Sequence, residues 1–214
     1  ANADVLYPTG FLPFDFLNGY RVHVKSETED FWYNSVGIVD GSSVSFCGRS
    51  GSGKTTAAIQ MAANIVRPFP EATIFFDDIE GGSNATRREL LTHFTPEEAE
   101  QRIIYRNTAV SAENFYKRIK KIHDMKMAEP DKYIYNTGLL DNFGNEISLF
   151  EPTVYILDSL PLLMPEQYNG EDGEKAKELA GQMSSTSAAK TITQIMRTII
   201  PMLTSANIIL LVIN

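Results

Sequence analysis

The chain has 214 residues and a formal net charge of −8, and 43% of its residues are hydrophobic and 21% charged. This length can bury a substantial core, and the composition excludes a disordered, collagen-like or coiled-coil chain. The longest apolar run, 208–213, is far shorter than the ~20 residues that span a bilayer. A single cysteine excludes an internal disulfide and favours a reducing compartment. We therefore expect a cytoplasmic protein with no membrane partner.

From residue 42 onward, apolar runs alternate with helical stretches. The expected strands are 43–47, 72–76, 103–105, 153–157 and 208–213, and the expected helices are 54–66, 85–93, 111–127 and most of 174–204. Solid apolar runs are typical of parallel strands that are covered on both faces. The alternation implies βαβ crossovers. The sequence thus predicts an α/β fold with a doubly wound, mostly parallel sheet and helices on both faces.

Two segments stand outside this alternation. Residues 1–41 form an approach segment with turn signals at Asn18-Gly19 and Asp40-Gly41, and we expect it to pack on the core formed by residues 42–214. Residues 129–152 are rich in Asn and Gly and are interpreted as an insertion that forms a small hairpin.

Residues 48–55 match the phosphate-loop pattern G-x-x-x-x-G-K-[ST] at every fixed position, between a predicted strand and a predicted helix. Glycines let backbone N–H groups turn toward phosphate oxygens, and the following helix presents its positive end to the same anion. Lys54 would neutralise the β- and γ-phosphates, and the Thr55 hydroxyl would bind Mg²⁺. We therefore expect an ATP–Mg²⁺ site formed by Gly48, Arg49, Ser50, Gly51, Ser52, Gly53, Lys54, Thr55 and Thr56.

Acidic residues follow two of the predicted strands. The apolar run from Val154 ends in Asp158, which is the Walker B pattern, and its carboxylate would hold Mg²⁺ opposite Thr55. The earlier run ends in Asp77, Asp78 and Glu80. Because the carboxyl ends of strands converge on the ligand crevice of a doubly wound sheet, an acid here can accept the proton of an attacking water. Spacing alone leaves all three as candidates.

These motifs together resemble the ATPase core of the RecA-type recombinases. Thr9-Gly10, Asp15 and 17–19 are similar to the phrase that precedes the phosphate loop in that family, and 154–159 is similar to its Walker B segment. The stretches 193–197 and 207–214 resemble bacterial RecA. The insertions 20–34 and 129–152 depart from bacterial RecA and favour a phage-type or divergent relative.

The resemblance implies a DNA-dependent ATPase that forms filaments on single-stranded DNA and promotes strand exchange in recombination and repair. It assigns the catalytic role to Glu80 together with Lys54, and adenine stacking to Arg87. It places a first DNA-binding loop at 165–190, with Arg197 and Lys190 as candidate DNA contacts. It further implies that the core continues beyond Asn214 into a γ-phosphate-sensing glutamine and a second DNA-binding loop.

The same motifs are also compatible with other classes of protein. These are a RecA-fold hexameric helicase or clock-type ATPase, a small-molecule P-loop kinase, and an assembly module that binds ATP without hydrolysing it. The net charge of −8 and the acidic residues of 165–190 oppose DNA binding through bulk electrostatics. The basic cluster within 117–126 is interpreted as a solvated helix face, and Cys47 as a small buried core residue.

Overall fold

The computed structural model of the chain describes residues 5–25, 30–141, 144–165 and 182–214. At its centre is a five-stranded sheet with the order β5-β11-β10-β6-β7. Its strands are β5 (Ser43–Phe46), β6 (Ile74–Asp78), β7 (Ile103–Arg106), β10 (Thr153–Asp158) and β11 (Ile208–Ile213). Every neighbouring pair is parallel. The prediction of an α/β fold with a parallel sheet is therefore confirmed.

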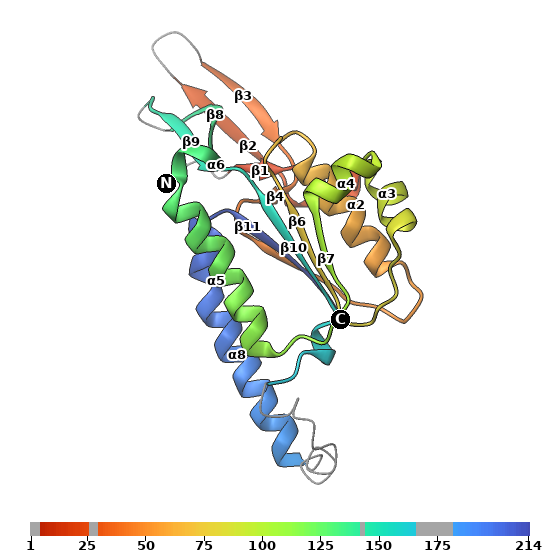
Figure 1. Cartoon of the computed structure of the whole chain (residues 1–214). Helices are drawn as coiled ribbons and strands as arrows, with labels where there is room; N and C mark the ends of the chain where they lie inside the picture. The colour runs from red at the N-terminus through yellow and green to blue at the C-terminus, as the bar shows by residue number, and fades with distance from the viewer. Residues whose placement is uncertain (1–4, 26–29, 142–143, 166–181) are drawn as a thin grey trace.

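Helices cover both faces of this sheet (Figure 1). One face carries α2 (Lys54–Val66), α3 (Ala85–Thr92) and α4 (Pro96–Arg102), and the other carries α5 (Ala112–Ala128) and α8 (Gln182–Ser205). Strand β10 is buried along its whole length. Its Val154 and Ile156 pack on the α2 side, and Tyr155 and Leu157 pack on the α5 side. Two apolar layers therefore meet at this strand, which explains its solid apolar run.

Local signals mark the helix starts. Ser111 Oγ accepts a hydrogen bond from Asn114 N at 3.1 Å and caps α5, as its sequence suggests. Helix α4 is not among the elements predicted from the sequence, although it begins with a capping box. In this box, Thr95 Oγ1 accepts from Glu98 N at 3.2 Å, and the Glu98 carboxylate accepts from Thr95 N at 2.8 Å.

The approach segment is anchored to the phosphate-loop helix. It comprises β1 (Leu6–Tyr7), α1 (Leu12–Asn18), the hairpin β2 (Tyr20–Lys25) to β3 (Asp30–Ser35), and β4 (Ile38–Val39). Buried Asp15 accepts hydrogen bonds from the backbone N–H of Thr9 and of Gly10 and from the Thr9 hydroxyl. Asn64 of α2 donates to Thr9 O at 2.9 Å. Asp15 of α1 thus fixes the Thr9-Gly10 segment by hydrogen bonds, and this segment contacts α2 through Asn64. The β2–β3 hairpin is not predicted from the sequence.

The insertion 129–152 does form a hairpin, β8 (Ile134–Leu140) to β9 (Glu146–Phe150), after the short α6 (Pro130–Tyr133). Buried Asn207, just before β11, joins it to the approach segment. The Asn207 amide donates to Tyr7 Oη and to Phe150 O, both at 2.7 Å, and accepts from Gly41 N at 3.1 Å. Among the described residues, no helix has the length and apolar character needed to cross a membrane.

Two expectations from the sequence are wrong. Cys47 is exposed rather than buried, because it follows the last residue of β5 and lies at the start of the phosphate loop. The basic cluster 117–126 is not a uniformly solvated face. Arg118 lies against buried Asp77, and Lys126 is itself buried. The Lys126 ammonium donates to Glu151 O at 2.6 Å and to Ala206 O at 2.9 Å, so it binds two carbonyl groups that border the core.

Lys126 predicts a pH dependence of stability. Burial lowers the pKa of Lys126 from its ordinary value of 10.5 to about 7. Between those values the unfolded chain binds more protons than the folded one, so the free energy of unfolding should rise with pH, by at most about 1.4 kcal/mol per pH unit. Lys126→Met removes this contribution. Denaturant unfolding from about pH 7 to pH 9 should show the stability of the wild type rising relative to Lys126→Met. A difference that is independent of pH would contradict this, and exposed Lys121→Met is the control.

Candidate functional site

The phosphate loop connects the carboxyl end of β5 to the first turn of α2. Gly51 and Gly53 adopt φ values of +74° and +87°, in the left-handed region that favours glycine. The Lys54 ammonium donates to Gly48 O at 2.8 Å and to Arg49 O at 3.1 Å. Helix α2 begins at Lys54 itself, so its amino end and the loop lie at the same place. The loop thus lies at the amino end of a helix, a position that in general favours anions.

A cavity of about 240 Å³ opens beside this loop. Its lining comprises residues 50–56, Glu80 and Arg87, Asp158 and Ser159, and Ile213 and Asn214. The structure therefore brings together most of the nucleotide, metal and catalytic residues predicted from the sequence, although they come from distant parts of the chain. Gly48 and Arg49 are not part of this lining, and their carbonyl groups bind Lys54 instead.

Thr55 and Asp158 both line the cavity and contact one another directly. The Thr55 hydroxyl donates to Asp158 Oδ2 at 2.6 Å, and buried Asp158 Oδ1 has no hydrogen-bond partner among the described residues. Burial raises the pKa of Asp158, and the nearby charges of Glu80 and Asp78 act in the same direction. The Thr55 hydrogen bond and the charge of Lys54 oppose that rise. A buried carboxylate of this kind is stabilised by a cation.

The oxygen atoms of this pair fit Mg²⁺. A hydroxyl and a carboxylate are hard oxygen ligands, and Mg²⁺ usually takes only one or two such protein ligands together with phosphate and water oxygens. The described residues contain no group of three or more His, Cys, Asp or Glu side chains that could hold a metal ion. Thr55 and Asp158 are the residues of this cavity that could hold Mg²⁺.

The three acids at the carboxyl end of β6 and just after it lie in different environments. Arg118 Nη1 lies 2.6 Å from Asp77 Oδ1, and Tyr155 donates to the other carboxylate oxygen of Asp77. Asp78 is buried and accepts hydrogen bonds from backbone N–H groups of the turn at 81–83. Glu80 alone among them lines the cavity, and it is exposed. Geometry thus separates three carboxylates that spacing leaves equivalent.

Arg87 reaches the rim of the cavity from α3. Asn84 caps this helix by accepting from Arg87 N at 2.8 Å. The Arg87 guanidinium donates to Thr56 Oγ1 of α2, also at 2.8 Å. The contact holds the start of α3 against the start of α2, so that Arg87 borders the space next to the phosphate loop.

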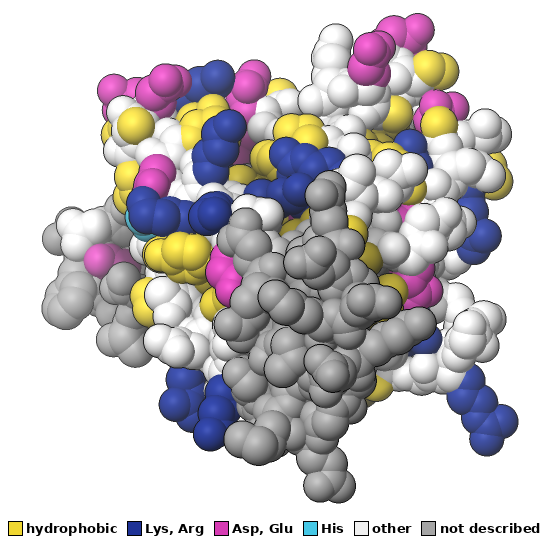
Figure 2. All heavy atoms as spheres, turned by 60° about the horizontal axis from the view of Figure 1, so that its bottom comes forward, with side chains coloured by type: hydrophobic (Ala, Val, Ile, Leu, Met, Phe, Trp, Pro, Cys, Tyr) yellow, Lys and Arg dark blue, Asp and Glu magenta, His cyan; other side chains and the backbone are white. Residues whose placement is uncertain are grey.

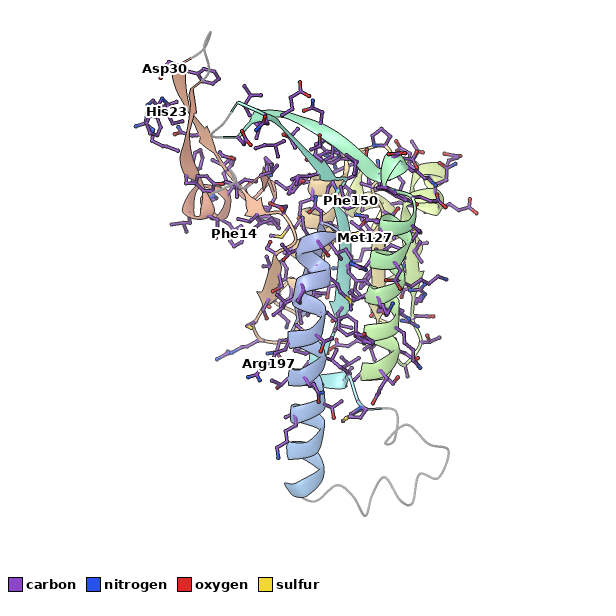
Figure 3. The ribbon with its side chains drawn as sticks, turned by 90° about the vertical axis from the view of Figure 1, so that its left-hand side faces the viewer. Phe14, His23, Asp30, Met127, Phe150 and Arg197 are labelled. Carbon is purple, nitrogen blue, oxygen red and sulfur yellow. The ribbon has the colours of Figure 1, made fainter. Side chains whose placement is uncertain are left out.

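The two candidate DNA contacts lie apart from this cavity. Lys190 and Arg197 are exposed on α8, which covers the opposite face of the sheet from α2. Figure 3 shows Arg197 pointing away from α5. Of the expected DNA loop at 165–190, residues 166–181 lie outside the described part of the chain. In Figure 2 the described Lys and Arg side chains form several separate groups, with Asp and Glu between them.

Several residues of this region are not predicted from the sequence. Ser159 lines the cavity because it directly follows Asp158 at the end of β10, and Ile213 and Asn214 line it because β11 lies between β5 and β10. Asn214 N donates to Phe46 O at 2.9 Å, which extends the pairing of β11 with β5 up to the phosphate loop. Strand order is a long-range property, and no local signal in the sequence reveals it.

Comparison with known proteins provides no assignment: no model of a protein family matches the chain, and neither does any curated protein. The cavity combines a glycine-rich loop at the amino end of a helix, a hydroxyl–carboxylate pair suited to a divalent cation, and an exposed carboxylate. Such a set can bind a nucleoside triphosphate and activate water toward its terminal phosphate.

Proposed function

We propose that the protein is an ATP-dependent recombinase of the RecA type, which hydrolyses ATP and forms filaments on single-stranded DNA. The observation that carries the ATPase part is the single cavity in which the phosphate loop, Asp158 and Glu80 meet. A phosphate loop alone accounts for nucleotide binding. The additional carboxylate on the same cavity supports hydrolysis.

In this proposal, different residues of the chain have separate roles in ATP hydrolysis. Backbone N–H groups of the loop bind the phosphates, and Lys54 moves from its loop carbonyl groups to the β- and γ-phosphates. Thr55 and Asp158 would hold Mg²⁺, which would supply positive charge to offset the negative charge of the phosphates. Glu80 accepts the proton of the attacking water.

The recombinase class is supported by the order of the motifs and by their physical connections. The Thr9-Gly10 turn and Asp15, which resemble the approach of that family, are bound to the phosphate-loop helix through Asn64. Helix α8 and β11 contain the stretch most similar to bacterial RecA, and β11 ends at the cavity. Lys190 and Arg197 lie exposed on α8, where they are accessible to a phosphate backbone.

The decisive test is ATP turnover with and without single-stranded DNA, combined with electron microscopy of the nucleotide-bound protein. The recombinase proposal predicts DNA-stimulated phosphate release and helical filaments. Closed rings would favour a helicase or clock-type ATPase. Phosphoryl transfer to a metabolite without DNA stimulation would favour a kinase, and nucleotide binding without turnover would favour an assembly module.

Arg197→Ala should weaken the response to DNA. Removal of one phosphate contact is expected to raise the DNA concentration for half-maximal stimulation several-fold and to reduce the magnitude of the salt slope of binding by about 1. Turnover without DNA should not change, because Arg197 is not part of the cavity lining. Lys190→Ala should act in the same direction, and Lys121→Ala on α5 is the control. An unchanged salt slope would remove Arg197 from the DNA surface.

A further inference from the structure

The carboxylate of Asp78 is fully engaged, although it is not part of the cavity lining. Asp78 Oδ1 accepts from Gly81 N at 2.8 Å and from Gly82 N at 3.3 Å. Asp78 Oδ2 accepts from Ser83 N at 2.9 Å and from the Tyr105 hydroxyl at 2.9 Å. Asp78 is 1% exposed. One buried carboxylate thus binds three successive backbone N–H groups and a side chain of the neighbouring strand.

The residues that it binds come directly after Glu80. Gly81 has a φ of +69°, which only glycine adopts readily, so the chain turns sharply at this point. On the other side of Glu80, Ile79 N donates to Asp158 O at 2.5 Å. Glu80 is therefore held between two fixed points, the end of β10 and the turn at 81–83.

The Tyr105 side chain of β7 contacts both Asp78 and this turn. Its Oη lies 2.9 Å from Asp78 Oδ2 and 2.9 Å from Ser83 O. The Arg88 guanidinium lies 3.6 Å from the centroid of the Tyr105 ring and donates to Ser83 O at 3.2 Å. Burial and the neighbouring Asp78 raise the pKa of Tyr105, so its hydroxyl stays protonated and can donate. Helix α3 has its own cap, Asn84, and does not depend on this hydroxyl.

We propose that Asp78 and Tyr105 are positioning residues for Glu80: by fixing the turn at 81–83 they hold the Glu80 carboxylate at the cavity in the orientation that water activation needs. This inference rests on the proposed ATPase function. A general base must lie within hydrogen-bond distance of the water whose proton it accepts. Small displacements of a catalytic group lower the reaction rate steeply. We call the hydrogen bonds of Asp78 and Tyr105 to the turn at 81–83 the clamp. Because the phosphate loop belongs to another segment of the chain, loss of the clamp should lower the rate of turnover and leave nucleotide binding intact.

The chain offers a matched pair of variants. Tyr105→Phe removes the hydroxyl that donates to Asp78, and Tyr155→Phe removes the hydroxyl that donates to Asp77. Both keep the aromatic ring, and Tyr155 is more buried. We expect Tyr105→Phe to lower kcat about 10-fold, with KM and Mg–ADP affinity within about twofold of wild type. Tyr155→Phe should lower the thermal stability and leave kcat unchanged.

Two further measurements separate positioning from a general loss of structure. In Tyr105→Phe, amide hydrogen exchange at residues 81–83 should accelerate while exchange in α2 does not. In the double variant Glu80→Gln/Tyr105→Phe, the loss of kcat should equal that of Glu80→Gln alone, because Tyr105 acts through Glu80.

The outcomes distinguish the two proposals. Turnover that is equal in wild type, Tyr105→Phe and Tyr155→Phe would overturn the positioning role, as would full additivity with Glu80→Gln. An absence of turnover in the wild type, with accelerated exchange at 81–83 in Tyr105→Phe, would instead overturn the ATPase function and leave the clamp as a purely structural device.

Discussion

Glu80→Gln is expected to lower kcat for ATP hydrolysis by about 100-fold or more, with nucleotide affinity within about twofold of wild type. Glutamine has the size of glutamate but cannot accept the proton of the attacking water. Glu80 is exposed, and it lines the cavity, whereas Asp77 and Asp78 of β6 do not. The substitution should therefore leave folding and the phosphate loop unchanged, and steady-state phosphate release together with nucleotide titration would measure both effects.

A matched control is available on α4. Glu97 is exposed in the first turn of α4 and does not line the cavity, so Glu97→Gln should keep wild-type turnover. If Glu80→Gln also kept wild-type turnover, Glu80 would not be the base. The carboxylates of Asp77 and Asp78 are already engaged by Arg118 and by the turn at 81–83, so neither could replace it without a rearrangement of β6.

Asp158→Asn is expected to act in opposite directions on stability and on activity. Because the pKa of Asp158 is raised in the folded protein, its ionised form at neutral pH destabilises the folded state, and wild-type stability should rise as pH falls through that pKa. Asparagine keeps the shape and can still accept from the Thr55 hydroxyl. The thermal stability of the nucleotide-free variant at neutral pH should therefore equal or exceed that of the wild type.

The same substitution should reduce ATP hydrolysis by about 100-fold or more, because a neutral amide is a poor ligand for Mg²⁺ and the metal supplies several kcal/mol of charge stabilisation. Nucleotide titration with Mg²⁺ and with a chelator gives an independent readout. Mg²⁺ should increase affinity in the wild type and change it little in Asp158→Asn. Asp124→Asn, at an exposed position on α5, is the control. A clear loss of stability in Asp158→Asn would contradict this account of the site.

Much of the fold can be read from short-range patterns. The apolar runs that form β10 and β11 are buried on both faces, and this burial is what a continuous apolar run indicates. The bounds of α2 follow from the phosphate loop before it and from Arg67-Pro68 after it. The phosphate loop is recognisable because it is one contiguous segment, in which Gly51 and Gly53 occupy left-handed backbone positions that favour glycine. Such features depend on residues that are neighbours in the chain, and the sequence by itself determines them.

Contacts between residues far apart in the chain determine the remaining features of the fold and of the site. Successive residues of a strand face opposite sides of the sheet, so Asp77 meets Arg118 of α5 while Asp78 meets Tyr105 of β7. No local pattern states which helix covers which side. The burial of Lys126 and the inclusion of Asn214 in the cavity likewise depend on packing and strand order. The sequence alone thus determines a parallel α/β protein with a phosphate loop. Only the tertiary structure decides which carboxylate reaches that loop, because this depends on contacts between segments far apart in the chain.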